Sequence, residues 1–90
     1  MFKILEDLIL LARDRRQNPV GDSYTNQLLE NKTLIKDKIL EEINELIEAV
    51  ETDTNKVHEA ADVFYHLLIY LESNNIKIED IMLELERRKK

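Results

Sequence analysis

The chain has 90 residues, with 19 acidic and 13 basic side chains and a formal net charge of -6 at pH 7. This length fits one domain over residues 1–90, and the acidic balance argues against nucleic acid or an anionic membrane as a partner, because both require a basic surface. The absence of cysteine excludes disulfides, thiol nucleophiles and cysteine-ligated zinc. With no apolar leader or membrane span in the sequence, we expect a cytoplasmic protein.

The composition predicts an all-α fold of four to five helices. Leu and Ile together number 24 against 4 Val, and Pro19 and Gly21 are the only proline and glycine, too few for a fold built from hairpins. Helices are predicted, in chain order, over residues 2–17, 24–30, Thr33 to about 51, Thr54 or Asn55 to about 72, and 78 to the carboxyl end.

The predicted boundaries follow from residues that stop or cap helices. Pro19 disfavours the α conformation at Asn18, so the first helix ends there. Ser23 or Thr25 caps the second helix, which Asn31 ends. The last helix has acids in its first turn and bases in its last, and both complement the helix dipole. These are Glu79, Asp80, Arg87, Arg88, Lys89 and Lys90.

The third predicted helix carries an apolar stripe and many glutamates. The stripe consists of Ile35, Ile39, Ile43, Leu46 and Val50. At 100° per residue, Glu41, Glu45 and Glu48 face away from this stripe, and Glu42 lies at its edge. Taken alone, this pattern indicates a solvated acidic face with a surface ion pair between Lys38 and Glu42.

The fourth predicted helix is apolar almost all round, which is typical of a buried helix. Its broad apolar face consists of Val57, Ala60, Ala61, Phe64, Leu68 and Leu71. The remaining strip holds Glu59, Asp62, His66 and Tyr70. Carboxylates on a buried helix need a cation from another helix, a shared proton or a bound metal, because an unpaired buried charge is costly.

Two helices thus each present acids three residues apart, Glu42 with Glu45 and Glu59 with Asp62. The short connector 52–55 requires the helices to be antiparallel, so the two pairs can face each other. Oxygen-only ligands select Mg²⁺ or Mn²⁺, and Mg²⁺ commonly shares substrate phosphates. The spacing therefore indicates metal-assisted chemistry on a polyphosphate, with structural ion pairs as the competing interpretation. Neither histidine follows a glutamate by three residues, which disfavours a di-iron bundle.

The same residues resemble a known family. Glu41-Glu42-Ile43-Asn44-Glu45, followed by Glu59-Ala60-Ala61-Asp62, is similar to the EExxE…ExxD signature of the MazG-like all-α nucleoside triphosphate pyrophosphatases. Further segments extend the similarity to the phosphoribosyl-ATP pyrophosphatase family of histidine biosynthesis, over nearly the whole chain. These are Arg15-Arg16, Pro19, Ser23-Tyr24-Thr25, Lys38, Tyr65-His66-Leu67-Leu68 and Asp80 through Arg88.

The resemblance implies a MazG-like helical bundle, a homodimer or dimer of dimers, and Mg²⁺-dependent hydrolysis of phosphoribosyl-ATP to phosphoribosyl-AMP and pyrophosphate. It assigns the metal to Glu42, Glu45, Glu59 and Asp62, and the proton of the attacking water to Glu41 or Glu45. It also implies that Lys38 and Arg15 or Arg16 contact phosphate. Tyr24 either stacks on the base or packs under its loop, and His66 is a hydrogen-bond partner beside the acids.

Three positions depart from the family pattern. Leu40 stands where the family usually has glycine, and Ile43 and Asn44 stand where it has small residues. Two other functions therefore stay open: a house-cleaning pyrophosphatase that acts on other nucleoside triphosphates, and a helical interaction module without catalysis. A panel of nucleotides separates the first from phosphoribosyl-ATP hydrolysis, and metal-independent stability would indicate the second.

Overall fold

The computed structural model describes residues 1–89, and over these it consists of five helices and no strand. The helices are α1 (Lys3–Gln17), α2 (Tyr24–Glu30), α3 (Lys32–Thr52), α4 (Lys56–Ser73) and α5 (Ile78–Arg88). The all-α prediction is confirmed, and the predicted boundaries agree within about two residues. Lys90, predicted in the last turn of the last helix, lies outside the described residues. None of the five helices is long and apolar enough to cross a membrane.

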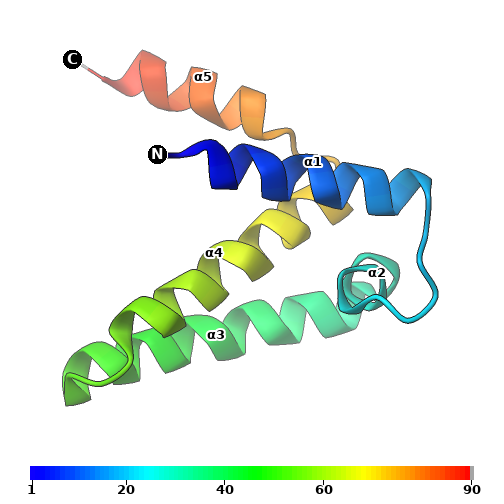
Figure 1. Ribbon diagram of the computed structural model, residues 1–90. Helices are drawn as coiled ribbons and strands as arrows, with labels where there is room; N and C mark the ends of the chain where they lie inside the picture. Colours follow the sequence, from blue (N-terminus) through cyan, green and yellow to red (C-terminus); the bar gives the residue numbers. More distant parts are fainter. Residues whose placement is uncertain (90) are drawn as a thin grey trace.

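The centre of the molecule is an antiparallel hairpin of α3 and α4, joined by a tight turn (Figure 1). Asp53 and Asn55 in this turn both adopt the left-handed conformation, which Asp and Asn tolerate better than most residues. α2 lies at the open end of the hairpin, and α1 crosses α4 near its carboxyl end (Figure 1). α5 runs alongside α1, so that the first turn of α1 and the last turn of α5 lie on the same side of the molecule (Figure 1).

The helix caps are partly those predicted. Ser23 caps α2, where its hydroxyl accepts a hydrogen bond from the Asn26 amide. α3 begins at Lys32 because Asn31, and not Thr33, caps it: the Asn31 side chain accepts from the Leu34 amide at 3.0 Å. Asn31 thus ends one helix and starts the next without an intervening loop.

The fully buried core is small and lies where α1, α2, α3 and α4 meet. Ala12, Leu28, Ile35 and Ile69 form it, one residue from each helix. Four partly buried side chains pack against these residues: Leu29, Leu34, Tyr65 and Tyr70. This core fixes the relative positions of the carboxyl half of α4 and the amino half of α3.

The apolar stripe predicted on α3 is only partly covered: Ile35 belongs to the buried core, and Ile39 and Leu46 are half-buried. Ile43 and Val50 are exposed, together with Leu40 and Ile47, whereas the packed side of α3 carries the buried Glu42. The side of the helix that carries Glu42 and Glu45 therefore lies against α4, and the expected solvated acidic face is wrong for Glu42. The part of the apolar stripe that contains Ile43 and Val50 is left open to solvent.

The predicted burial of α4 is likewise incomplete, since Val57, Phe64 and Leu67 are exposed. A second apolar surface is a groove of about 880 Å³ between α1 and α5, lined by residues that include Phe2, Leu10 and Met82. The Cα radius of gyration is 14.2 Å, against about 12 Å for a compact domain of this length. One chain alone is therefore an open structure with much uncovered apolar surface.

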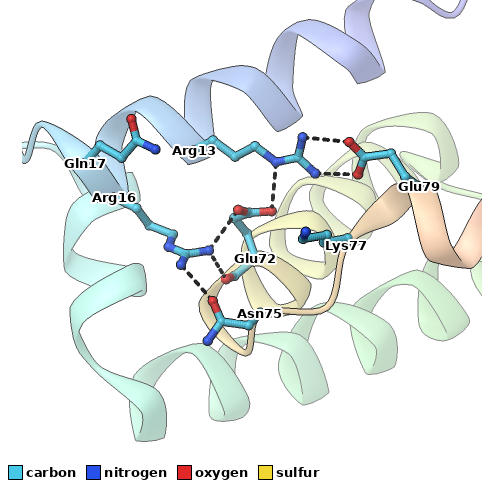
Figure 2. A pocket seen from close by; sticks show the side chains of 7 residues that line it. All are labelled: Arg13, Arg16, Gln17, Glu72, Asn75, Lys77 and Glu79. Carbon is cyan, nitrogen blue, oxygen red and sulfur yellow. Dashed lines mark hydrogen bonds and ion pairs between the residues drawn. The ribbon is translucent and has the colours of Figure 1, made fainter.

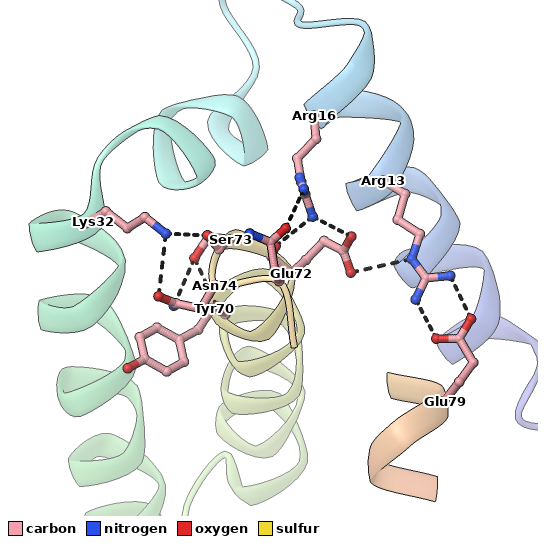
Figure 3. Close-up of polar contacts among 9 residues, drawn as sticks. Arg13, Arg16, Lys32, Tyr70, Glu72, Ser73, Asn74 and Glu79 are labelled. Atoms are coloured by element: carbon pink, nitrogen blue, oxygen red, sulfur yellow. Dashed lines mark hydrogen bonds and ion pairs between the residues drawn. The ribbon is translucent and has the colours of Figure 1, made fainter. Parts of the chain in front are cut away.

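α5 is held to the rest of the chain by an arginine corner, which we define as Arg13, Arg16, Glu72, Asn75 and Glu79 (Figure 2). Arg13 donates two hydrogen bonds to Glu79 at the start of α5, at 2.9 and 2.6 Å. Figure 3 shows that Arg13 and Arg16 approach the Glu72 carboxylate from α1. Ion pairs thus join α1 to the end of α4 and to α5.

Candidate active site

A cluster of carboxylates lies between α3 and α4. Glu42 and Glu45 of α3 and Glu59 of α4 each place one oxygen within 4.8 Å of the others. Asp62, one turn after Glu59, forms an adjoining group with Glu59 and His58. The structure therefore brings together the four acids predicted from their spacing, across the predicted antiparallel pair of helices.

Two carboxylates of this cluster each have a buried oxygen without a partner among the described residues. Within residues 1–89, Glu42 Oε2 and Glu59 Oε2 are buried without a hydrogen-bond partner. Burial, followed by the charge of Glu45, raises the pKa of the Glu42 carboxyl, and the same two causes in the same order raise the pKa of Glu59. Such an arrangement is costly unless a proton or a cation joins it.

His58 belongs to the site but was not predicted as a ligand. Its Nε2 lies 3.4 Å from Asp62 Oδ2, one turn further along α4. The sequence spacing could have predicted this contact, because residues four apart on a helix lie on the same face. The side chain is largely exposed, which makes it a member of the rim rather than of the buried part.

Lys38 is the basic side chain of α3 at this site, but it does not pair with Glu42 as predicted. Its Nζ lies 3.2 Å from Glu41 Oε2, and this hydrogen bond is the main cause of the raised pKa of Lys38. Glu41 is exposed and lies outside the carboxylate cluster. The correction follows from packing: Glu42 is directed into the α3–α4 contact, whereas Glu41 stays at the surface beside Lys38.

Tyr24 and His66 meet where α2 packs on α4. The Tyr24 hydroxyl lies 3.0 Å from His66 Nε2, and His66 Nδ1 lies 2.7 Å from the Asp62 carbonyl oxygen. The buried imidazole also contacts the edge of the Tyr65 ring. Burial raises the pKa of Tyr24, and the charge of Lys38 opposes this shift. Both predicted residues therefore lie next to the carboxylates.

The two neighbouring arginines have different surroundings. Arg15 Nη1 donates to Ser23 Oγ at 2.8 Å, which holds the half-buried Arg15 beside the start of α2. Arg16 belongs to the arginine corner, where it donates to Glu72 Oε1 at 2.8 Å. Glu72 lies ten residues beyond Asp62 on α4, roughly 15 Å along the helix axis. Arg16 is therefore not brought to the carboxylates.

The donor set suits a hard divalent cation. Glu42, Glu45, Glu59 and Asp62 offer only oxygen ligands, which Mg²⁺ and Mn²⁺ prefer. The buried oxygens without partners are the structural observation that supports this fit. A pocket of about 220 Å³ adjoins the cluster and is lined by residues that include Glu45, Thr54 and Glu59.

Comparison with known proteins shows which family the chain is similar to. The sequence pattern of the family described as phosphoribosyl-ATP pyrophosphohydrolase matches residues 5–89. The chain is 42% identical to the phosphoribosyl-ATP pyrophosphatase of Clostridium acetobutylicum, over 96% of this chain and 81% of that protein. It is 34% identical to the phosphoribosyl-ATP pyrophosphatase of Haloarcula marismortui, over 96% and 93%.

A longer relative is similar over part of its length. The histidine biosynthesis bifunctional protein HisIE of Caldanaerobacter subterraneus subsp. tengcongensis is 41% identical over 99% of this chain, which spans 45% of that protein. These matches confirm the family that the motifs indicated. The chain belongs to the phosphoribosyl-ATP pyrophosphohydrolase family and is a hydrolase.

Proposed function

We propose that this chain hydrolyses phosphoribosyl-ATP to phosphoribosyl-AMP and pyrophosphate, with Mg²⁺ as the cofactor. The substrate is that of the named relatives. The observation that carries the metal dependence is the pair of buried carboxylate oxygens without partners, on Glu42 and Glu59. A divalent cation would remove the repulsion in the cluster and at the same time attract a triphosphate.

Each side chain has a proposed role. Glu42, Glu45, Glu59 and Asp62 would hold Mg²⁺ or Mn²⁺. The metal, when bound, neutralises phosphate charge and lowers the pKa of a bound water. Lys38 and Arg15 bind phosphate oxygens as cations, but Arg16 is left out because Glu72 already holds its guanidinium.

Glu41 and Glu45 are the candidates to accept the proton of the attacking water. Glu45 lies within the carboxylate cluster, whereas Glu41 lies outside it beside Lys38. If Glu45 accepts the proton, Glu41→Gln retains most activity and Glu45→Gln loses it even at saturating metal. If Glu41 accepts it, Glu41→Gln loses activity while metal affinity is kept.

The substrate assay also tests the alternative function. Leu40 and Ile43, which depart from the family pattern, are exposed on the outer face of α3, so within one chain they do not narrow the space between α3 and α4. Purified protein should therefore release pyrophosphate from phosphoribosyl-ATP, and EDTA should abolish the release. Release from ordinary or damaged nucleoside triphosphates alone would indicate the house-cleaning activity. No release from any nucleotide would indicate a module without catalysis.

We further propose that the working form is a homodimer. Exposed apolar residues on α3 and α4, among them Ile47 and Phe64, form a surface too large for a stable monomer of this size to leave open. The 220 Å³ pocket is smaller than a typical nucleotide site, so the remainder of the substrate needs another surface. A second chain would supply one.

Sedimentation at micromolar concentration tests this assembly. The wild-type chain should sediment as a dimer of the 10.7 kDa protomer. Phe64→Glu should give monomers if the α3–α4 surface is the interface, and Leu83→Glu tests the groove between α1 and α5 in the same way. A dimer of dimers is indicated if the wild-type chain sediments as a tetramer and each variant alone sediments as a dimer. A monomeric wild-type chain contradicts the proposal.

A further inference from the structure

We propose that His66 is a positioning residue that makes the Tyr24 hydroxyl a hydrogen-bond acceptor at the edge of the carboxylate cluster. The inference rests on the proposed function for its catalytic consequence, but its structural content can be tested separately. It starts from two consecutive contacts of the His66 ring, one with the Asp62 carbonyl oxygen and one with the Tyr24 hydroxyl.

The protons of this chain of contacts are fixed by what each group can do. A carbonyl oxygen only accepts hydrogen bonds, so His66 Nδ1, 2.7 Å from the Asp62 oxygen, must carry a hydrogen. In a neutral imidazole the other nitrogen is then an acceptor. The proposal is the neutral ring, in which His66 Nε2 accepts from Tyr24, 3.0 Å away, and the only hydrogen of the Tyr24 hydroxyl is used there.

The consequence concerns the substrate side of Tyr24. With its hydrogen donated to His66, the hydroxyl cannot donate to a phosphate oxygen, which is itself only an acceptor. It can accept from a donor, and the charged groups that act on it include Lys38 and Glu42. The donor to this hydroxyl is either the Lys38 ammonium or a water molecule beside the carboxylates, where Mg²⁺, when bound, would retain several waters.

The surroundings hold this arrangement in place. His66 is 5% exposed and contacts both Tyr24 and Tyr65 edge-on. The Tyr24 and Tyr65 rings stack with centroids 6.3 Å apart. Since Asp62 belongs to the cluster and to this chain of hydrogen bonds, the position of Tyr24 depends directly on the helix turn that carries a proposed metal ligand.

Tyr65 provides a matched control. Its hydroxyl also joins α4 to α2, through a 2.6 Å hydrogen bond with Thr25 Oγ1, but it has no hydrogen bond with His66. Tyr65→Phe and Tyr24→Phe thus each remove one hydroxyl from the same helix–helix contact. A purely structural role for Tyr24 predicts similar effects of the two substitutions.

The first experiment is NMR of protein labelled with ¹⁵N in its two histidines, without nucleotide. Long-range correlations should show His66 as the Nδ1–H tautomer, with His66→Gln identifying its signals. Tyr24→Phe should shift the His66 Nε2 resonance, and Tyr65→Phe should leave it nearly unchanged. An Nε2–H tautomer, or a ring protonated on both nitrogens, overturns the inference whether or not the protein is active.

The second experiment measures pyrophosphate release. Tyr24→Phe and His66→Phe should each lower kcat about three- to tenfold, the effect of one neutral hydrogen bond, with KM nearly constant. The kcat of the double variant should be no lower than that of either single variant, because both substitutions break the same hydrogen bond. His66→Gln, which places an acceptor oxygen towards Tyr24, should restore part of kcat. Equal losses in Tyr24→Phe and Tyr65→Phe, or additive losses in the double variant, contradict the positioning role.

Discussion

Two glutamates of this chain are buried to the same extent but have opposite surroundings. Glu72, 9% exposed, accepts hydrogen bonds from Arg16 at 2.8 Å and from Arg13 at 3.4 Å (Figure 3). Glu42, 8% exposed, lies among other carboxylates and has one oxygen without a partner within residues 1–89. The chain thus neutralises one buried carboxylate with two arginines and leaves the other dependent on something from outside.

The two ends of α4 therefore have different roles. An unpaired buried charge costs several kcal/mol, so a fold does not keep one without compensation elsewhere. At the carboxyl end the compensation is internal, and Glu72 fastens α1 to α4. At the amino end Glu59 and Asp62 face Glu42 and Glu45, and an external divalent cation is the proposed compensation.

Glu42→Gln is the most direct test of the difference between the two buried glutamates. We expect pyrophosphate release to fall about 10³-fold or more, since the loss of a metal ligand removes several kcal/mol of charge stabilisation in the transition state. The free energy of unfolding without metal should stay the same or rise, because a neutral amide relieves repulsion from Glu45. Steady-state kinetics and urea denaturation measure the two effects.

Glu51→Gln is the matched control, since Glu51 is an exposed glutamate on the same helix and does not line the pocket beside the carboxylates. It should change neither activity nor stability appreciably. If Glu42→Gln retains more than a tenth of wild-type turnover at saturating Mg²⁺, Glu42 is not a metal ligand.

Glu72→Gln should lower stability and leave activity unchanged, the reverse of what is expected for Glu42→Gln. It removes the carboxylate shared by two arginines, and the free energy of unfolding should fall by about 2–3 kcal/mol. This is below the full cost for a buried pair, because the side chains of Arg13 and Arg16 are 29% and 38% exposed. Turnover per folded molecule should be unchanged.

The corresponding surface control is Glu84→Gln. Glu84 pairs with Arg87 and Arg88 on exposed α5, where an ion pair contributes less than about 1 kcal/mol. Equal destabilisation by the Glu72 and Glu84 substitutions in urea denaturation would remove the distinction between the arginine corner and an ordinary surface pair.

The helices and much of the carboxylate site could be predicted because their signals are local. Pro19 and Ser23 mark boundaries that depend on a few neighbouring residues, whereas the left-handed conformation of Asn55, whose side chain makes no capping hydrogen bond within residues 1–89, was not predicted. The spacing of Glu42 with Glu45 and of Glu59 with Asp62 predicted that these acids face each other, because a short connector forces antiparallel helices. The acids do converge.

The arginine corner and the packed side of α3 could not be predicted in this way. Arg16 and Glu72 are 56 residues apart, and their contact depends on the angle at which α1 crosses α4. On α3, the apolar stripe with Ile43 is real, but periodicity does not say which partner covers it. The chain packs the Glu42 side inward, and the exposed part of the stripe, with Ile43 and Val50, is left for the proposed second chain.

Adding a divalent metal should also distinguish Glu42 from Glu72. Mn²⁺ or Mg²⁺ at ten times its dissociation constant should raise the free energy of unfolding by about 1.4 kcal/mol at fixed protein concentration. The increment should persist in Glu72→Gln and disappear in Glu42→Gln, since only the second carboxylate belongs to the proposed metal site. Urea denaturation with and without the metal measures it. An equal increment in both variants would place the cation elsewhere.

The smallest expected effect concerns acid stability and Glu79, the other partner of Arg13. Hydrogen bonds from Arg13 lower the pKa of the Glu79 carboxyl from 4.5 to about 2, so the pair stabilises the fold above pH 4.5 and this contribution is lost as the pH falls towards 2. Glu42 and Glu59 have raised pKa values and the opposite sign: without metal, their contribution to stability decreases as the pH rises above about 4.5.

Urea denaturation of wild type and Glu79→Gln between pH 7 and pH 2 tests this sign. The two proteins should differ by a constant amount above about pH 5, smaller than the effect of Glu72→Gln because Glu79 is exposed, and should converge towards pH 2. Glu42→Gln should instead gain on wild type as the pH rises. If the difference in unfolding free energy between wild type and Glu79→Gln does not change with pH, the charge of Glu79 does not contribute to its contact with Arg13. Glu72 would then be the only carboxylate of the arginine corner whose charge stabilises the fold.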